Sequence, residues 1–380
     1  MPTIDGVDLR VSLKKLLIGV LVTIVPISLV SLYALTQTYQ ALEGTIGGHL
    51  EAVADMTATE VSQYIQERVL DIAGMAAGPE VISAVAAANR SRQGMSEAAL
   101  LVDMQRIDRV WNTKEGDATL ERILSSPASL FLRHHHKLDP RILRITVTDE
   151  KGATVAASHK TMDYYQADEE YWQNIYAQGR GAVSLTDILY DEATHADYLG
   201  IGVPVLDPGS NRVIGTLDAL VNFSSLISMV GRAKLGATGR TLLVKQDGTV
   251  IASPSTTLSM KQSSEEYTAV RDALKTLSGR QTGYIGRTLS GRGRTLIGFA
   301  DTGLKTTYPK LGWVVLVAQD AHEGLVPVRA MGWVIVLLSL TGLAMVTFLA
   351  VYFSLHRKMP ATDIDELAVE TKRDIGETLR

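Results

Sequence analysis

Two long apolar segments, one near each end of the chain, constrain its topology more than any other feature. Residues 16–35 contain no charged side chain, and neither do residues 331–355. A hydrocarbon core about 30 Å thick is crossed by roughly 20 apolar helical residues, so each segment can span a membrane. A cleaved signal peptide is the alternative for the first segment. Its apolar run exceeds the roughly 7–15 residues usual there, and no small-x-small cleavage motif follows closely, which favours an anchor.

The charges beside these segments predict their orientation. Basic residues precede the first segment and follow the second: Arg10, Lys14, Lys15, His356, Arg357 and Lys358. Because positive charge stays on the cytoplasmic side, residues 1–15 and 356–380 are expected in the cytoplasm. Residues 36–330 then lie outside it. The chain has no cysteine, which is compatible with a bacterial envelope protein, so we expect a two-pass protein of the bacterial inner membrane.

A helical stalk is predicted over residues 36–79. Apolar residues recur there every three or four positions, and no proline interrupts them before Pro79. These residues are Leu42, Ile46, Leu50, Val53, Met56, Val61, Ile65, Val69 and Ile72. The apolar stripe either packs along the chain's own globular part or pairs with the same helix in a homodimer, and different stretches can do each.

One supersecondary unit is used twice in the middle of the chain. The segments "ITVTDEKGATVAAS" (145–158) and "LLVKQDGTVIAS" (242–253) both read as hairpins, and each precedes a helix and three strands. This order predicts an α+β fold of two antiparallel-sheet modules, over residues 80–223 and 224–325, with helices on one side of each sheet.

The arrangement resembles the double-Cache sensor domains of bacterial chemoreceptors and sensor kinases, over about residues 37–325. The resemblance rests on the flanking spans, the stalk, the repeated hairpin, "DEEYWQNIY" followed by "LYDEATHADYLGIGVPV", and "GFADTG…LGWVVLVAQD". It implies a dimeric receptor built from two PAS-like modules. The membrane-distal module, residues 80–223, would bind a small molecule, and the proximal module would relay the signal to the last helix.

The stretch "DYYQADEEYWQNIY" (163–176) combines aromatic rings with carboxylates and reads as a helix. By the resemblance, the pocket wall is formed by Tyr165, Asp168, Tyr171, Trp172, Tyr190, Asp191 and Tyr198. Rings beside carboxylates suit a cationic ligand. The alternative is structural: acids at 168–170 complement the start of a helix, and Trp172 with Ile175 or Tyr176 forms its buried face.

The sequence departs from the members of this family that bind amino acids. Those carry an arginine two places before the tryptophan and an aspartate on the last strand. Glu170 and Leu220 stand at these positions, and Asp218 and Asn222, which lie on the same alternating face as Leu220, are the alternatives for the second. An amine or another small polar molecule is therefore expected in place of a standard amino acid.

Other functional classes find no support in the sequence. There is no phosphate-binding loop and no nucleophile–base set, so neither an enzyme nor a cofactor is expected. The formal charge of −4 suggests no affinity for nucleic acid, and the adjacent histidines 134–136 point in different directions, which disfavours a metal site. Residues 359–380 are too few for an output domain, so we expect a separate effector protein, reached through a short amphipathic tail. A solute-capture protein feeding a transporter and a non-binding envelope scaffold are the alternatives.

Overall fold

A computed structural model describes residues 13–191, 196–233, 235–253, 263–276, 281–324 and 326–355. The chain divides into two compact units, residues 1–44 with 325–380, and residues 45–324. The cytoplasmic tail expected at 356–380 lies outside the described residues.

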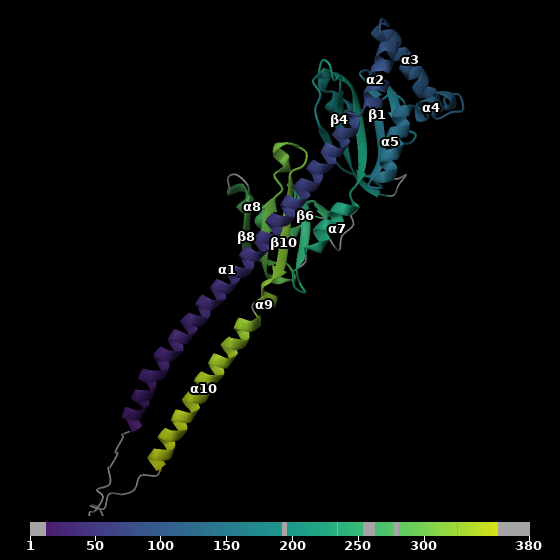
Figure 1. Cartoon of the computed structure of the whole chain (residues 1–380). Coiled ribbons are helices and arrows are strands. Elements are labelled where there is room, and N and C mark those ends of the chain that lie inside the picture. The colour runs from purple at the N-terminus through teal and green to yellow at the C-terminus, as the bar shows by residue number, and fades with distance from the viewer. Residues whose placement is uncertain are drawn as a thin grey trace, which may run out of the picture. The chain divides into compact units, whose positions relative to one another are not determined.

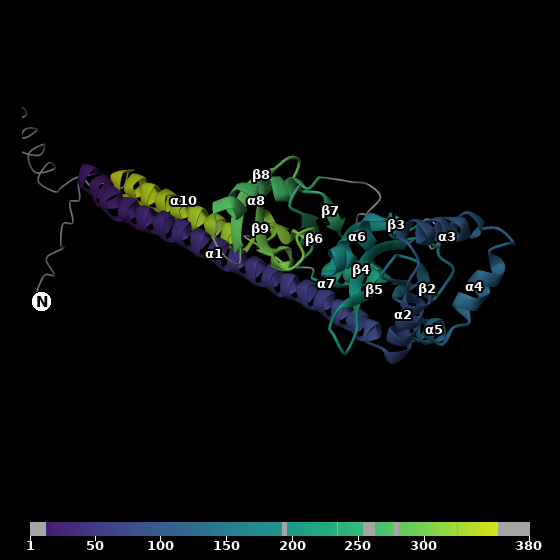
Figure 2. The same ribbon diagram turned by 90° about the horizontal axis from the view of Figure 1, so that it is seen from above.

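The first unit contains the apolar ends of two helices. Helix α1 (Leu13–Ala76) begins here and is 64 residues long, with Pro26 inside it, and α10 (Val326–Leu355) follows the second unit. The two helices run side by side in this unit (Figures 1 and 2). Within α10, Ala330–Leu349 is long and apolar enough to cross a membrane, with a mean hydropathy of 2.2. The α1 segment Ile24–Ala76 passes this test of length and hydropathy only together with Pro79–Ser91, as a pair of helices bent by 56°. By length and composition, the described residues thus contain one helix that could cross a membrane, or two if the bent pair is one span.

The second unit contains two five-stranded antiparallel sheets with the same topology. The first sheet has the order β2-β1-β5-β4-β3, and the second has the order β7-β6-β10-β9-β8. The first sheet comprises β1 (Ile142–Asp149), β2 (Thr154–Ala157), β3 (Ser184–Asp191), β4 (Ala196–Leu206) and β5 (Val213–Asn222). The second comprises β6 (Arg240–Lys245), β7 (Val250–Ala252), β8 (Thr282–Leu289), β9 (Gly293–Asp301) and β10 (Trp313–Asp320). The predicted fold class and the repeated unit are therefore confirmed.

Each sheet carries a helix between its second and third strands. The first sheet has α6 (Glu170–Tyr176) followed by the short η1 (Ala177–Gly179), and the second has α8 (Glu265–Thr276). The remaining helices are α2 (Pro79–Ser91), α3 (Glu97–Val110), α4 (Asp117–Leu124), α5 (Pro127–Leu138), α7 (Ser224–Arg232), η3 (Leu304–Thr306) and α9 (Ala321–Gly324). We call the elements α2 to β5 the first module and the elements α7 to β10 the second module.

The apolar stripe of α1 packs along its own sheets. Leu50, Ala54 and Ile65 are fully buried. Close approach depends on Gly298 of β9, because a Cβ at that position would lie 2.3 Å from the backbone of Leu50. Met56 is different, since 58% of its surface stays exposed. Most of the predicted stripe thus belongs to the core of this chain.

The helix predicted over residues 163–176 is shorter than expected. Only Glu170–Tyr176 is helical, and Glu169 is the residue that precedes the helix. The preceding segment is an extended loop, held by a bridge between Tyr165 and Ala153. Asp168 therefore lies before the helix and not in its first turn.

Candidate functional site

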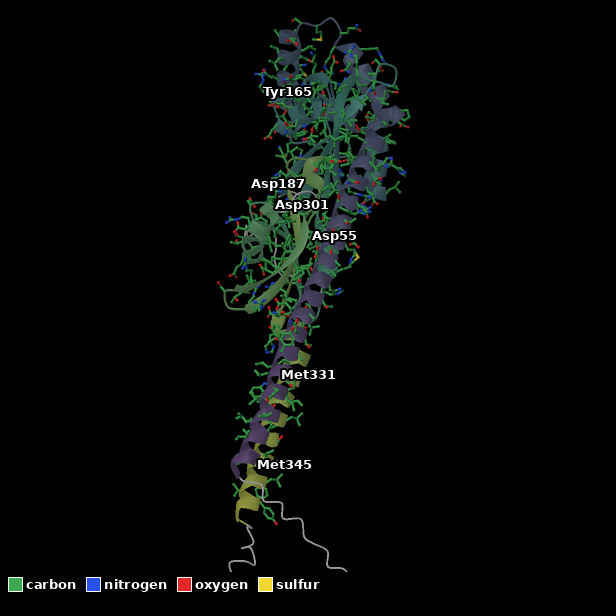
Figure 3. The ribbon with its side chains drawn as sticks, turned by 90° about the vertical axis from the view of Figure 1, so that its left-hand side faces the viewer. Asp55, Tyr165, Asp187, Asp301, Met331 and Met345 are labelled. Carbon is green, nitrogen blue, oxygen red and sulfur yellow. The ribbon has the colours of Figure 1, made fainter. Side chains whose placement is uncertain are left out.

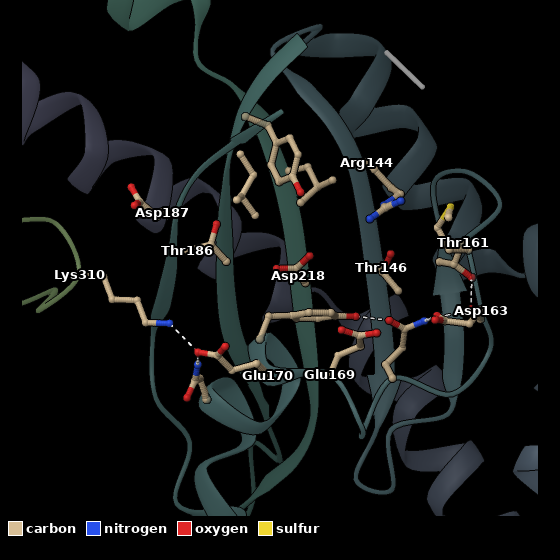
Figure 4. A pocket seen from close by; sticks show the side chains of 17 residues that line it. Arg144, Thr146, Thr161, Asp163, Glu169, Glu170, Thr186, Asp187, Asp218 and Lys310 are labelled. Atoms are coloured by element: carbon tan, nitrogen blue, oxygen red, sulfur yellow. Dashed lines mark hydrogen bonds and ion pairs between the residues drawn. The ribbon is translucent and has the colours of Figure 1, made fainter. Parts of the chain in front are cut away.

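A cavity of about 430 Å³ lies on one face of the first sheet, between the sheet, α6 and the loop that precedes α6 (Figure 4). Strands β1, β5, β4 and β3 form its floor and one side. Its lining residues are Arg144, Thr146, Thr161, Met162, Asp163, Gln166, Glu169, Glu170, Tyr171, Asn174, Thr186, Asp187, Leu189, Tyr198, Asp218, Leu220 and Lys310.

Two charged side chains of opposite sign face the cavity from neighbouring strands. Strand β1 pairs with β5 so that Thr146 lies opposite Asp218 and Arg144 lies opposite Leu220. Arg144 and Asp218 are therefore diagonal neighbours, a relationship that places two residues roughly 7–8 Å apart, with their Cβ atoms somewhat closer. Among the residues that the structure describes, neither side chain forms a hydrogen bond or an ion pair, and Figure 4 shows both directed at the cavity.

Burial changes the acidity of Asp218. Only 8% of this residue is exposed. Loss of solvation raises the pKa of its carboxyl group to about 7, and the positive charge of Arg144 lowers that pKa only in part. An ammonium group beside Asp218 would favour the ionised carboxylate and would relieve the cost of its burial.

A chain of hydrogen bonds fixes the cavity wall next to α6. The Tyr171 hydroxyl donates to Oε1 of Gln166, and the Gln166 amide donates to the carbonyl of Asp163 at 3.0 Å and to its carboxylate. Burial raises the pKa of Tyr171, so its hydroxyl stays protonated and acts as the donor. This chain joins the loop to the helix.

The side of the cavity formed by α6 and β3 carries two ion pairs. Nζ of Lys310 lies 2.9 Å from Oε1 of Glu170, and Lys245 pairs with Asp187. The hydrogen bond from Lys310 lowers the pKa of Glu170. We call these four residues the lysine-paired wall.

The structure brings two of the predicted site residues into the cavity lining, Tyr171 and Tyr198. Tyr165 is half-buried and packs against a separate cluster around Trp111 and Tyr164. The exposed Asp168 also lies outside the lining. Figure 3 labels Tyr165 within the first module and Asp187 near the second.

Trp172 lies on the same face of the sheet but beyond the cavity. Its indole Nε1 donates to Oγ1 of Thr148 at 2.8 Å, and its ring stacks on Tyr176 with centroids 4.7 Å apart. Tyr190 and Asp191 belong to β3, but their side chains lie outside the described residues. Ligand contact by these three residues therefore stays a prediction.

Three residues that line the cavity were not predicted from the sequence: Arg144, Gln166 and Lys310. Arg144 had a detectable signal, because it is a charge at an alternating position of the strand "ILRITVT". Asp218 was noticed, but Leu220 was preferred; the structure places both on the cavity surface. No sequence pattern around Lys310 marked it as a cavity residue, because it comes from the second module.

Comparison with known proteins agrees with this architecture. The sequence model of the Cache domain matches residues 38–328. Similar solved structures include the ligand-binding domain of the Pseudomonas aeruginosa amino acid chemoreceptor PctC in complex with GABA, at 14% identity and a TM-score of 0.45, covering 72% of this chain and 100% of that one. Another is the ligand-binding domain of the Campylobacter jejuni chemoreceptor Tlp3 in complex with L-norvaline, at 12% identity and a TM-score of 0.48, covering 75% and 94%. No curated protein matches the chain significantly. Since the family match spans well over half of the sequence, the chain belongs to the Cache domain family.

Proposed function

We propose that this protein is an extracytoplasmic sensor of a small zwitterionic molecule, one that carries a protonated amine and an anionic group. The observation that supports this proposal is the pair Asp218 and Arg144, two opposite charges that face one cavity without an ion-pair partner in the described part of the chain. The amine would bind Asp218 and the anionic group would bind Arg144. No reaction is part of the proposal.

The rest of the cavity suits such a ligand. The rings of Tyr171 and Tyr198 line it, and an aromatic face attracts a cation by roughly 0.5–2 kcal/mol. Arginine binds carboxylates in a planar, two-bonded geometry, which gives orientation as well as affinity. Of the residues predicted from sequence, Tyr171 and Tyr198 would contact the ligand, and Trp172 would hold α6 on the sheet.

The sequence favoured an amine as the ligand, and the proposed ligand carries an anionic group as well as the amine. The sequence favoured an amine or another small polar molecule over a standard amino acid, because Glu170 occupies the position of an arginine. Arg144 supplies a guanidinium group to the cavity from β1. A ligand with both charges is therefore compatible with the loss of the usual arginine.

Homodimerisation is part of the proposal. Within residues 45–76, a seam along α1 stays exposed to solvent: His49, Met56, Gln63 and Leu70 recur every seven residues, and Ala52 and Gln66 lie three residues after His49 and Gln63. Met56 and Leu70 are 58% and 70% exposed. A spacing that alternates between three and four residues is the pattern by which two helices pair in a coiled coil. A second copy of α1 would cover this seam.

Signal output would leave through α10. The short helix α9 directly precedes α10. The carboxylate of Glu323 in α9 accepts hydrogen bonds from the backbone N–H of Ala237 at 2.6 Å and of Thr238 at 2.9 Å. These contacts hold α9 to the segment that enters β6. We propose two membrane crossings, with residues 36–330 outside the cytoplasm, and a separate effector protein that receives the signal inside.

The test uses the full-length protein in phospholipid nanodiscs. Thermal unfolding and titration calorimetry would be measured with three groups of compounds: alkylamines, carboxylic acids, and molecules that carry both groups. We expect the last group to raise the unfolding temperature most, since a ligand at 100 times its Kd adds about 2.7 kcal/mol. Binding of a molecule with both charges should weaken at least about tenfold in both Asp218→Asn and Arg144→Met. If no compound with both charges binds, or if neither substitution weakens its binding, the proposal is wrong.

A further inference from the structure

Lys310 belongs to the second module but lines the cavity of the first. It lies in the loop between η3 and β10, and its Nζ contacts Oε1 of Glu170 at 2.9 Å. Glu170 also accepts a weaker hydrogen bond from Asn174 at 3.4 Å. Figure 4 shows Lys310 reaching the cavity from one side, while Arg144 lies on the other side of Asp218. The binding site is therefore built from both modules.

The second module supplies both positive charges of the lysine-paired wall. Glu170 and Asp187 line the cavity, and their partners Lys310 and Lys245 come from elements of the second module. Without these lysines, this side of the cavity would present two uncompensated carboxylates. It would then attract a second positive charge on the ligand.

The sheet order separates this wall from Asp218. Strand β4 lies between β5, which carries Asp218, and β3, which carries Asp187. Neighbouring strands are about 4.8 Å apart, so the wall lies roughly 10 Å from the proposed amine site. The part of a ligand that extends from its amine toward β3 would meet Glu170 and Lys310.

We propose that Lys310 determines the charge specificity of the site: by neutralising Glu170, it disfavours ligands that carry an additional positive charge on the part facing β3. This inference rests on the proposed function and adds the residue that selects among zwitterionic ligands. A ligand with a neutral extension fits the neutralised wall. A ligand with a cationic extension must compete with Lys310 for Glu170.

The expected effect is moderate because the pair is accessible to water. The side chains of Lys310 and Glu170 are 51% and 80% exposed. Exposed pairs are screened by solvent and salt, so removing the lysine should change the preference about threefold to fivefold. The change should shrink as the salt concentration rises.

The test compares two ligands that share the amine and the carboxylate and differ in the charge of the extension, L-lysine and L-norleucine. Titration calorimetry on the full-length protein in nanodiscs gives the ratio of the two Kd values. Lys310→Met should shift this ratio toward L-lysine about threefold to fivefold. Adding Glu170→Gln to Lys310→Met should return the ratio to within about twofold of the wild-type value.

Lys305→Met is the matched control. Lys305 lies close to Lys310 in the chain, but its Nζ donates to the side-chain oxygen of Gln246 and it does not line the cavity. The ratio should stay within about twofold of wild type in this variant. Lys310→Gln repeats the test with a polar side chain, and thermal unfolding checks that each variant is folded.

Two results overturn the inference. If both ligands bind and Lys310→Met leaves the ratio unchanged, Lys310 does not determine charge specificity, although the proposed function stands. If the wild-type protein binds neither ligand nor any other molecule with both charges, the proposed function fails and this inference fails with it.

Discussion

The indole Nε1 of Trp172 donates a hydrogen bond to the Oγ1 of Thr148 at 2.8 Å, in the interior of the first module. Thr148 is fully buried, and its hydroxyl also lies 2.9 Å from that of Thr216 on the adjacent strand β5. The three side chains form a buried polar chain that ties α6 to the sheet. Trp172 therefore contacts the buried side of the sheet and does not line the cavity.

Trp172→Phe should therefore lower stability more than it lowers ligand affinity. The substitution keeps most of the ring and removes one buried hydrogen bond, which costs about 1–2 kcal/mol of the free energy of unfolding. Chemical denaturation measures that loss, and calorimetry should show a ligand Kd within about threefold of wild type. A large loss of affinity at unchanged stability would instead place the indole against the ligand.

Asp218 should make the stability of the unliganded protein fall as the pH rises from about 4 to about 7. Its carboxyl pKa is 3.8 before folding and about 7 in the folded protein, so the folded state holds the extra proton within this window. Stability then decreases with rising pH, by up to about 4 kcal/mol across the window. Denaturation of wild type and Asp218→Asn across this range isolates the effect, because other carboxyl groups titrate equally in both. A difference between the two that is independent of pH would contradict the assignment.

The same carboxyl group should give ligand binding the opposite pH dependence. A protonated amine needs the ionised form of Asp218, so the Kd should rise about tenfold for each pH unit below about 7 and level off above it. Titration calorimetry from pH 5 to pH 8.5 measures this profile. Asp218→Asn should bind weakly with a flat profile. An equally flat profile in the wild type would exclude Asp218 as the partner of the amine.

The fold was predictable from sequence because its signals are local. The alternation in "ILRITVT" and the turn "DEKG" locate β1 and the hairpin that follows, and the same signals recur in "LLVKQDGTVIAS". The start of α6 was predicted less accurately. Acids at 168–170 suit a helical first turn, but the backbone at Tyr165 instead pairs with Ala153.

The site was less predictable because it depends on contacts between distant parts of the chain. Tyr171 and Tyr198 were identified from their aromatic neighbourhood, and both line the cavity. Whether Asp218 or Leu220 faces the cavity could not be decided by alternation, since residues two apart on a strand share one face. Lys310 reaches the cavity only because the second module packs beside the first.

Arg144→Met should reduce the protein to a weak amine binder. A hydrogen bond to a charged group contributes about 1.5–3 kcal/mol, so affinity for a ligand with both charges should fall about tenfold to 150-fold. Affinity for an alkylamine should change little, because its ammonium group would contact Asp218. Calorimetry with an amino acid and the amine that lacks its carboxylate separates these effects. Equal losses for both compounds would show that Arg144 supports the shape of the cavity and does not bind the anionic group.

Single cysteines provide a clean test of the proposed dimer, because the chain contains none. Met56→Cys and Leu70→Cys place a thiol on the exposed seam of α1, where two copies would bring identical residues together across a two-fold axis. Mild oxidation in membranes should then produce a covalent dimer in both variants. Gln105→Cys is the matched control, since Gln105 is exposed on α3 and does not belong to the seam. Cross-linking at Gln105 as efficient as at Met56 would indicate random collision, and its absence at both seam positions would exclude pairing through α1.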